Sequence, residues 1–113
     1  MSFEHIRLER AGPVASVTLA RPQVRNAMDD RTLRELTAAF QGLAKDGAVR
    51  VVVVRGEGKD FCAGADVEWM RRAGKLKAAQ GKKDARLLAE MCRAVDECPV
   101  PVIARAHGAV FGG

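Results

Sequence analysis

Four consecutive valines at residues 51–54 constrain the fold of this 113-residue chain more than any other feature. β-Branched residues favour strands, and a strand without polar residues is typical of one that is covered on both faces. Such strands belong mainly to α/β proteins, in which helices flank a largely parallel sheet. The preceding residues agree, because Leu33, Leu36, Phe40 and Leu43 recur at the spacing of one apolar helix stripe. We therefore expect an α/β fold with one domain at most.

The remaining hydrophobic pattern predicts further strands and helices on both sides of the valine run. Residues 4–9 and 15–19 alternate in polarity, as the two strands of a hairpin do. Asp29 and Asp30 are suited to cap the first helix, and Gly47 is suited to end it. The other predicted elements are a turn over 10–13, a short helix over 67–72, a mobile polar loop over 74–83, an amphipathic helix from about residue 84 with Leu88, Cys92 and Val95 on one side, and a buried strand over 102–104.

The loop that follows the valine strand has features of an anion-binding segment. Residues 63–65 are small, which lets a ligand approach the backbone closely. Asp66 is suited to cap the next helix, whose first N–H groups then point into the space before it. Such groups are suited to an anionic oxygen. The alternative is an ordinary loop that ends in a capped helix.

A second loop of this kind occupies residues 107–113 and also follows a predicted buried strand. If the two strands are neighbours, the two loops are able to direct two N–H donors at one point, which is an oxyanion hole. The segment reaches Gly112 and Gly113, at a strand-to-helix junction. From that junction we expect the chain to be a fragment of a larger fold.

The strings RPQVRNAMD at residues 21–29, FCAGADV at residues 61–67 and HGAVFGG at residues 107–113 carry a family resemblance. In this order and at this spacing, the chain resembles the crotonase superfamily of enoyl-CoA hydratases and isomerases. The resemblance implies that residues 1–113 are the N-terminal part of a single crotonase domain with a ββα spiral fold, and that the C-terminal half is absent. It also implies an enzyme that adds water to the double bond of an acyl-CoA thioester.

The resemblance also assigns roles to individual residues. Ala65 and Gly113 would donate the two oxyanion-hole N–H groups to the thioester carbonyl. No metal or redox cofactor is implied, because coenzyme A enters as part of the substrate. The residues implied in binding coenzyme A are Arg25, near its phosphates, together with Ala27, Ala63, Asp66 and Val67.

The chain departs from the family pattern in its acid–base residues. Hydratases of this family use two glutamates that would fall beyond Gly113, so residues 1–113 alone are expected to be inactive. His107 stands where many relatives have asparagine; it is suited either to acid–base work or to a hydrogen bond that fixes the turn. The open alternatives are another crotonase reaction, such as isomerisation, dehydration or acyl-CoA hydrolysis, and a non-catalytic acyl-CoA-binding, RNA-binding or interaction module.

A narrower resemblance lies in residues 66–72, where Trp69 and Met70 with basic neighbours are similar to the methylglutaconyl-CoA hydratase branch of leucine breakdown. The alternative is that both side chains pack the helix.

Charge and composition bear on partners and location. The net charge of +5 favours anionic partners. Arginines and lysines between residues 71 and 86 form a basic cluster. A solvated loop explains this cluster, and contact with coenzyme A phosphates is the alternative. Nucleic acid is disfavoured as a partner, because aromatic residues that stack on bases are missing after Trp69. The odd number of cysteines and the lack of a signal peptide or membrane-length apolar run favour a cytoplasmic protein. By resemblance, the intact enzyme would be a homotrimer or a dimer of trimers. The basic cluster consists of Arg71, Arg72, Lys75, Lys77, Lys82, Lys83 and Arg86.

Overall fold

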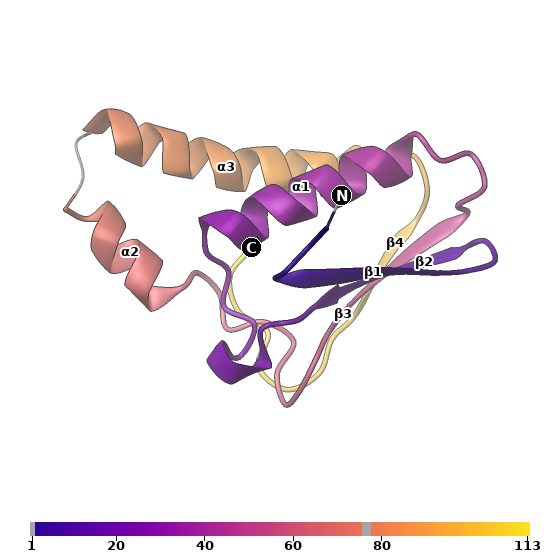
Figure 1. Cartoon of the computed structure of the whole chain (residues 1–113), viewed down its shortest axis with the longest axis horizontal. Coiled ribbons are helices and arrows are strands. Elements are labelled where there is room, and N and C mark those ends of the chain that lie inside the picture. Colours follow the sequence, from indigo (N-terminus) through magenta and orange to yellow (C-terminus); the bar gives the residue numbers. More distant parts are fainter. Residues whose placement is uncertain (1, 76–77) are drawn as a thin grey trace.

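The computed structural model of the protein describes residues 2–75 and 78–113, which form a mixed α/β fold around one sheet (Figure 1). The predicted fold class is confirmed. The strands are β1 (Ile6–Ala11), β2 (Val14–Leu19), β3 (Val51–Gly56) and β4 (Val102–Arg105). The helices are the short 3-10 helix η1 (Pro22–Val24) and the α-helices α1 (Asp30–Ala44), α2 (Val67–Ala73) and α3 (Ala78–Asp96).

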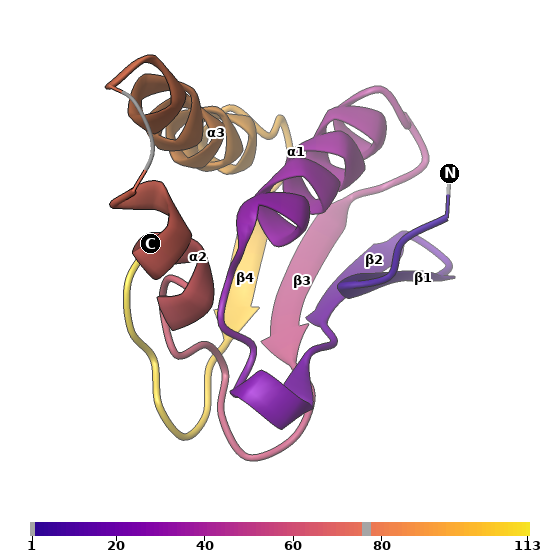
Figure 2. The same cartoon turned by 60° about the vertical axis from the view of Figure 1, so that its left-hand side comes forward.

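The four strands lie in the order β1-β2-β3-β4. β1 and β2 form the predicted antiparallel hairpin, with its turn at Gly12 and Pro13, whereas β3 and β4 add in parallel. Each parallel connection crosses over through helices, and crossovers of this kind are right-handed. Because both crossovers progress in the same direction along the sheet, α1 and α3 lie on the same face (Figure 2). Among the described helices, none combines the length and apolar character that a membrane crossing requires.

The core lies between this face of the sheet and the two long helices. Leu33, Leu36, Phe40 and Leu43 of α1 are all buried, so the predicted apolar stripe is confirmed. The N-cap is Asp29, whose side chain accepts a hydrogen bond from the Thr32 N–H at 2.9 Å. This stripe packs on buried residues of β1, β2, β3 and α3, which are Ile6, Ala15, Val17, Leu19, Val52 and Met91.

The prediction that the valine strand is buried on both faces is wrong for the described residues. Val52 is fully buried, but Val51 and Val53 are only half-buried. The strand expected over residues 102–104 is present as β4, but the prediction that it is buried is wrong, because Ile103 is 54% exposed and Ala104 is exposed as well. Both residues of the pair Val53 and Ile103 point away from α1 and α3, because side chains alternate along a strand. The run of valines therefore reflects a face that no helix of the described chain covers.

The expected polar loop over residues 74–83 is wrong in its second half, because α3 already begins at Ala78. Residues 76 and 77, which include Lys77 of the basic cluster, lie outside the described residues. From Ala78 to Lys83 the helix is mostly exposed, so it needs no apolar stripe there. Alanine, glutamine and lysine are good helix formers without burial. A prediction based on apolar periodicity therefore did not detect the first turns of α3.

The predicted apolar side of α3 is also partly wrong. Met91 is its buried residue, and Leu87, Ala94 and Val95 pack around it, whereas Leu88 and Cys92 are exposed. The spacing of residues 87, 91 and 94 defines a stripe just as well as the predicted one. Leu88 and Cys92 instead face the end of the chain at Gly113, at 3.5 and 3.9 Å from where a Cβ on that glycine would lie.

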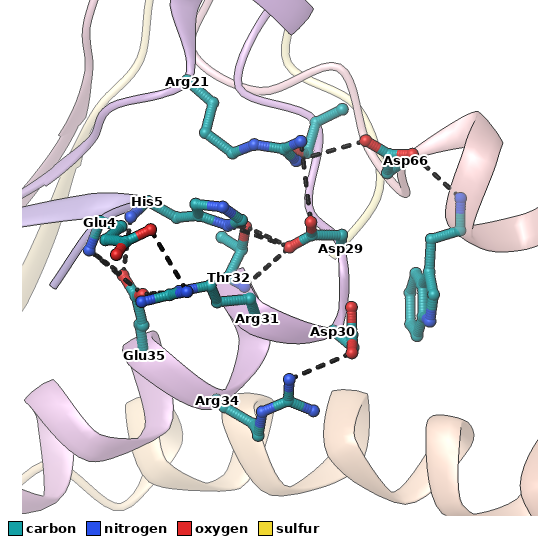
Figure 3. A network of polar contacts seen from close by, with 12 residues as sticks. Glu4, His5, Arg21, Asp29, Asp30, Arg31, Thr32, Arg34, Glu35 and Asp66 are labelled. Carbon is teal, nitrogen blue, oxygen red and sulfur yellow. Dashed lines mark hydrogen bonds and ion pairs between the residues drawn. The ribbon is translucent and has the colours of Figure 1, made fainter.

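Glu35 ties the N-terminal segment to α1. Its carboxylate accepts hydrogen bonds from the backbone N–H of His5 at 2.8 Å and from Nε of Arg31 at 2.7 Å (Figure 3). Burial acts to raise the pKa of Glu35, but the hydrogen bonds from Arg31, His5 and Glu4 together lower it below its ordinary value. The charged form is therefore the form that stabilises the fold.

A depressed pKa gives stability that is present above about pH 4.3, the ordinary glutamate value, and is lost as the pH falls through the folded-state pKa. We expect Glu35→Gln to lower the free energy of unfolding at pH 7 by about 1–2 kcal/mol. Between pH 5 and pH 2, the free energy of unfolding of this variant should fall less steeply than that of the unchanged protein. Urea unfolding across this pH range measures both effects. Glu90→Gln, at an exposed position of α3, is the matched control, and an equal effect there would contradict the assignment.

Candidate functional site

Three segments that are far apart in the sequence meet beyond the ends of the parallel strands. Residues 61–66 run between residues 25–28 on one side and residues 107–111 on the other. On the first side, the N–H groups of Ala63 and Asp66 donate to Arg25 O and Met28 O at 3.0 and 2.8 Å. On the second side, Cys62 N–H donates to Ala109 O at 3.1 Å, and Phe111 N–H donates to Cys62 O at 2.9 Å. The structure thus places the two glycine-containing loops side by side.

The backbone of Ala65 faces the second loop. Gly64 O accepts a hydrogen bond from Met28 N–H at 2.8 Å. In a trans peptide the N–H points opposite to the C=O, so the Ala65 N–H is directed away from Met28 and toward residues 111–113. No hydrogen bond from this N–H is found among the described residues, and Ala65 is exposed. It is therefore a free donor at the junction of the two loops.

Gly112 lies directly against this donor. Its φ is +76°, and a Cβ at this position would lie 3.0 Å from Gly64 Cα and 3.9 Å from Ala65 N. Only glycine combines this backbone conformation with such a close approach. Gly113 follows and lies against α3. The implied oxyanion donor Ala65 thus lies beside Gly112, the neighbour of the second implied donor Gly113, and the catalytic role of both donors stays a prediction.

An apolar cavity of about 400 Å³ opens beside the two glycines. It lies between α1, α3 and the sheet, and among the described residues neither a carboxylate nor an imidazole lines it. Its lining includes Phe61, Met91, Val95, Phe111, Gly112 and Gly113. The free Ala65 N–H thus lies beside Gly112, one of the residues that line this apolar space.

The residues implied in coenzyme A binding lie around the first loop. Arg25 has a side chain that is 76% exposed, with Nε 3.7 Å from Asp60 Oδ2, so it is accessible to a phosphate. Ala27 is buried and Ala63 half-buried, while Val67 is exposed at the start of α2. The N–H groups of Ala63 and Asp66 are already bonded within the protein, and Asp66 O accepts from Met70 N–H at 2.9 Å. Among the described residues, the Ala63 carbonyl is therefore the backbone polar group of these two residues that has no partner within the protein. The Asp66 side chain caps α2 as predicted, accepting from Trp69 N–H at 3.0 Å.

His107 holds a turn. Its Nε2 donates to Gly58 O at 2.8 Å, which confirms the hydrogen bond that the sequence suggested as an alternative to acid–base work. Cys62 is also structural. Burial raises the pKa of its thiol, despite the hydrogen bond from Gly64 N–H, so the thiol is kept in its weakly nucleophilic neutral form. Among the described residues, no group of three or more His, Cys, Asp or Glu side chains is placed to hold a metal ion.

Asn26 is a structural residue whose role sequence reasoning missed. It is 1% exposed, and its φ is 57°. Its Oδ1 accepts from Arg21 N–H at 2.8 Å, and its Nδ2 donates to Glu57 O and Asp60 O, each at 2.9 Å. The amide therefore fastens the Arg25 loop to the loop after β3. The available signal was the residue type, because asparagine tolerates the left-handed region better than most residues.

We expect Asn26→Ala to lower the free energy of unfolding by about 3 kcal/mol, since three hydrogen bonds are lost and buried backbone partners are left unpaired. The urea unfolding midpoint measures this loss. Gln23→Ala, at an exposed position of η1, is the control. Equal unfolding midpoints for the two variants would show that the amide contributes no such stability.

Arg21 is the second residue that sequence reasoning missed, and it lies at the centre of a polar network (Figure 3). Its Nη1 donates to Ala27 O at 2.6 Å and to Asp66 Oδ2 at 3.3 Å, and its Nη2 lies 3.7 Å from Asp29 Oδ2. The guanidinium thereby bridges the N-cap carboxylates of α1 and α2. Burial acts to raise the pKa of Asp29, but hydrogen bonds from Thr32 and the charges of Arg21 and His5 together lower it.

The chain is similar in sequence to known proteins of one family. A sequence model described as enoyl-CoA hydratase/isomerase matches residues 9–113. A probable enoyl-CoA hydratase of Rhodobacter capsulatus is 36% identical over 99% of this chain and 42% of its own length. The mitochondrial Delta(3,5)-Delta(2,4)-dienoyl-CoA isomerase of Mus musculus is 37% identical over 99% of this chain and 37% of its own length.

Solved structures give the same picture. The crystal structure of an enoyl-CoA hydratase/carnithine racemase from Magnetospirillum magneticum is 36% identical, with a TM-score of 0.91 over 98% of this chain and 42% of that one. That of a putative enoyl-CoA hydratase from Streptomyces coelicolor has a TM-score of 0.87 at 39% identity over 95% of this chain and 39% of that one. The chain thus spans about two fifths of the length of these relatives.

Proposed function

Because this chain belongs to the enoyl-CoA hydratase/isomerase family, we propose that it polarises the thioester carbonyl of an acyl-CoA through the N–H groups of Ala65 and Gly113. The observation that carries the proposal is the free Ala65 N–H, which points toward the loop where Gly112 approaches it. Donors fixed before the reaction stabilise the charge that develops on the carbonyl oxygen as an enolate forms. That stabilisation is larger in the transition state than in the ground state, so it accelerates the reaction.

Coenzyme A would bind along the first loop as part of the substrate. Arg25 is exposed there, and a guanidinium pairs well with phosphate. Backbone groups around Ala27, Ala63, Asp66 and Val67 would receive the rest of the nucleotide. The small side chain of Ala63, which is half-buried, supports this placement, because it leaves the backbone open to close approach.

For the reaction we propose hydration of an enoyl-CoA, with acid–base glutamates supplied from outside residues 1–113. The names of its relatives support two reactions, because a probable hydratase and a dienoyl-CoA isomerase match at comparable identity. The oxyanion hole is compatible with both, and the acid–base residues select between them. A non-catalytic acyl-CoA-binding module is the third candidate.

Two measurements test the proposed reaction: the gene sequence after Gly113 and an activity assay. Reading the codons after Gly113 shows whether two glutamates follow at the family positions. The full polypeptide that the gene encodes is then assayed with crotonyl-CoA for hydration and with a 3,5-dienoyl-CoA for isomerisation. We expect loss of the crotonyl absorbance with the first substrate. Turnover of the dienoyl substrate alone would replace hydratase by isomerase, and acyl-CoA binding without either turnover would favour the binding module.

The methylglutaconyl-CoA substrate stays a narrower proposal. Trp69 packs partly against the core, as the helix-packing alternative requires, whereas Met70 is exposed. We also propose a homotrimer or dimer of trimers in the cytoplasm. The uncovered apolar side chains of Ile103, Val110 and Phe111 support association. Sedimentation of the full polypeptide measures its oligomeric state.

A further inference from the structure

We propose that Arg21 is a positioning residue that fixes the direction of the Ala65 N–H without contacting the substrate. The inference rests on the proposed function, because it concerns how the same donor is held. Arg21 comes from the segment between β2 and η1, on the opposite side of the first loop from Gly112. It therefore acts on Ala65 through the residues that flank it.

The direction of the Ala65 N–H depends on a very short ladder. Three backbone hydrogen bonds make it: Ala63 N–H to Arg25 O at 3.0 Å, and then Met28 N–H to Gly64 O and Asp66 N–H to Met28 O, both at 2.8 Å. The bond from Met28 N–H to Gly64 O is the one that orients the peptide that carries the Ala65 N–H, and the short run of bonds ends at Asp66. A side-chain contact at Asp66 therefore adds a restraint on the donor.

Arg21 supplies that restraint by binding both segments that these hydrogen bonds join, residues 25–28 (the first strand) and residues 63–66 (the second strand). One nitrogen, Nη1, donates to Ala27 O on the first strand and to Asp66 Oδ2 on the second. These contacts flank the paired residues Met28 and Ala65. The guanidinium thus fixes the separation of the two strands at the point where the Gly64–Ala65 peptide is oriented.

Burial and charge make this contact specific for arginine. The side chains of Arg21, Asp29 and Asp66 are only 15%, 15% and 12% exposed. A planar fork with five donors satisfies two carboxylates and a carbonyl at once, whereas a lysine ammonium is a compact charge that lacks this fork. Without the guanidinium, two poorly hydrated carboxylates would remain, with His5 as the one basic side chain that contacts Asp29 in this network. Their repulsion would separate the strands.

A purely structural role for Arg21 predicts loss of stability alone, whereas a positioning role predicts a change in the orientation of the Ala65 N–H in a folded protein. Asp29 caps α1 through Thr32, and Asp66 caps α2 through Trp69, and neither bond involves Arg21. Both helices therefore keep their caps when Arg21 is replaced. Replacing Arg21 should change only the position of α2 and Ala65 relative to residues 27–28. This change is measured through the polarisation of the thioester carbonyl that accepts from the Ala65 N–H.

The test uses the full polypeptide that the gene encodes, with butyryl-CoA labelled with ¹³C at the thioester carbonyl. This saturated thioester does not undergo hydration, and a hydrogen bond to its carbonyl moves the ¹³C resonance downfield. We expect the parent protein to show this downfield shift and Arg21→Met to lose most of it. Arg21→Lys should keep part of it. With crotonyl-CoA, kcat should fall about 10- to 100-fold in Arg21→Met, while KM changes about threefold or less.

Three further variants separate the possible outcomes. Arg10→Met removes an exposed arginine paired with Asp46 and should leave the resonance unchanged. Ala65→Pro removes the donor itself and should abolish the shift. Asp66→Asn keeps an oxygen to cap α2 but removes the carboxylate partner of Arg21, so it should reduce the shift even if Arg21→Met fails to fold.

If bound butyryl-CoA shows no downfield shift in the parent, the oxyanion site and the role of Arg21 are both wrong. If the shift is present and is lost in Ala65→Pro, but persists in folded Arg21→Met or in Asp66→Asn, the oxyanion site stands and the inference about Arg21 is overturned.

Discussion

Replacing Ala65 by proline is expected to lower turnover about 10²- to 10³-fold in the full polypeptide, the usual effect of losing one oxyanion-hole donor. Proline has no N–H, so the donor that points toward Gly112 disappears. Ala65→Ser keeps the N–H and adds only a hydroxyl at an exposed position, so it should lose much less turnover. Steady-state kinetics of both variants with crotonyl-CoA measures the difference.

Substrate binding should weaken less than turnover in Ala65→Pro, because the hydrogen bond strengthens as the enolate forms. Proline also restricts the residue before it, and Gly64 has a φ of +92°, so some local distortion is expected. Circular dichroism is the check that the variant is folded. A folded Ala65→Pro variant with near-normal turnover would show that Ala65 is not an oxyanion donor.

Residues 1–113 alone are expected to hydrate crotonyl-CoA at least about 10²- to 10⁴-fold more slowly than a complete hydratase, which is the usual cost of losing one acid–base group. The cavity beside Gly112 and Gly113 is lined by apolar residues and glycines, without a carboxylate. Glu68, the acidic residue closest in sequence after Asp66, is exposed and paired with Arg71 at 2.8 Å. The oxyanion donors would then act without a proton donor or acceptor.

The loss of enoyl absorbance measures this rate, and an enoyl-CoA hydratase of known activity is the positive control. A matched chain with Glu68→Gln should be no slower than residues 1–113 unchanged. Turnover of ordinary enzyme size by the 113-residue chain would show that the missing glutamates are not needed, and loss of that turnover in Glu68→Gln would identify the acid–base group.

Local patterns predicted the parts of the fold that depend on local physics. The caps at Asp29 and Asp66 follow from residue type and position, and the stripe from Leu33 to Leu43 follows from helical spacing. The start of α3 was missed because an exposed helix needs no apolar period. The uncovered face of β3 was missed because four valines look the same whether or not a partner layer is present.

The site was predictable only where a single segment carries the signal. The two loops were recognisable by their small residues, but their contact at Gly64 and Gly112 depends on the sheet order. Arg21 and Asn26 act through partners 45 and 34 residues away. No local pattern distinguishes such an arginine from a solvated one, so their roles emerge only from the three-dimensional structure.

The meeting of three distant segments also has a kinetic consequence. Hydrogen bonds at the site join Arg25 to Ala63 and Cys62 to Phe111, whereas the β1–β2 hairpin and α1 close over short stretches of chain. Long-range closure carries a larger entropic cost before any contact is gained. We therefore expect the hairpin and α1 to order early during folding and the junction of the loops to order late. Amide protons at Met28 and Phe111 should then exchange with solvent faster than those of the hairpin, which would make the site less protected than the elements on which it is built.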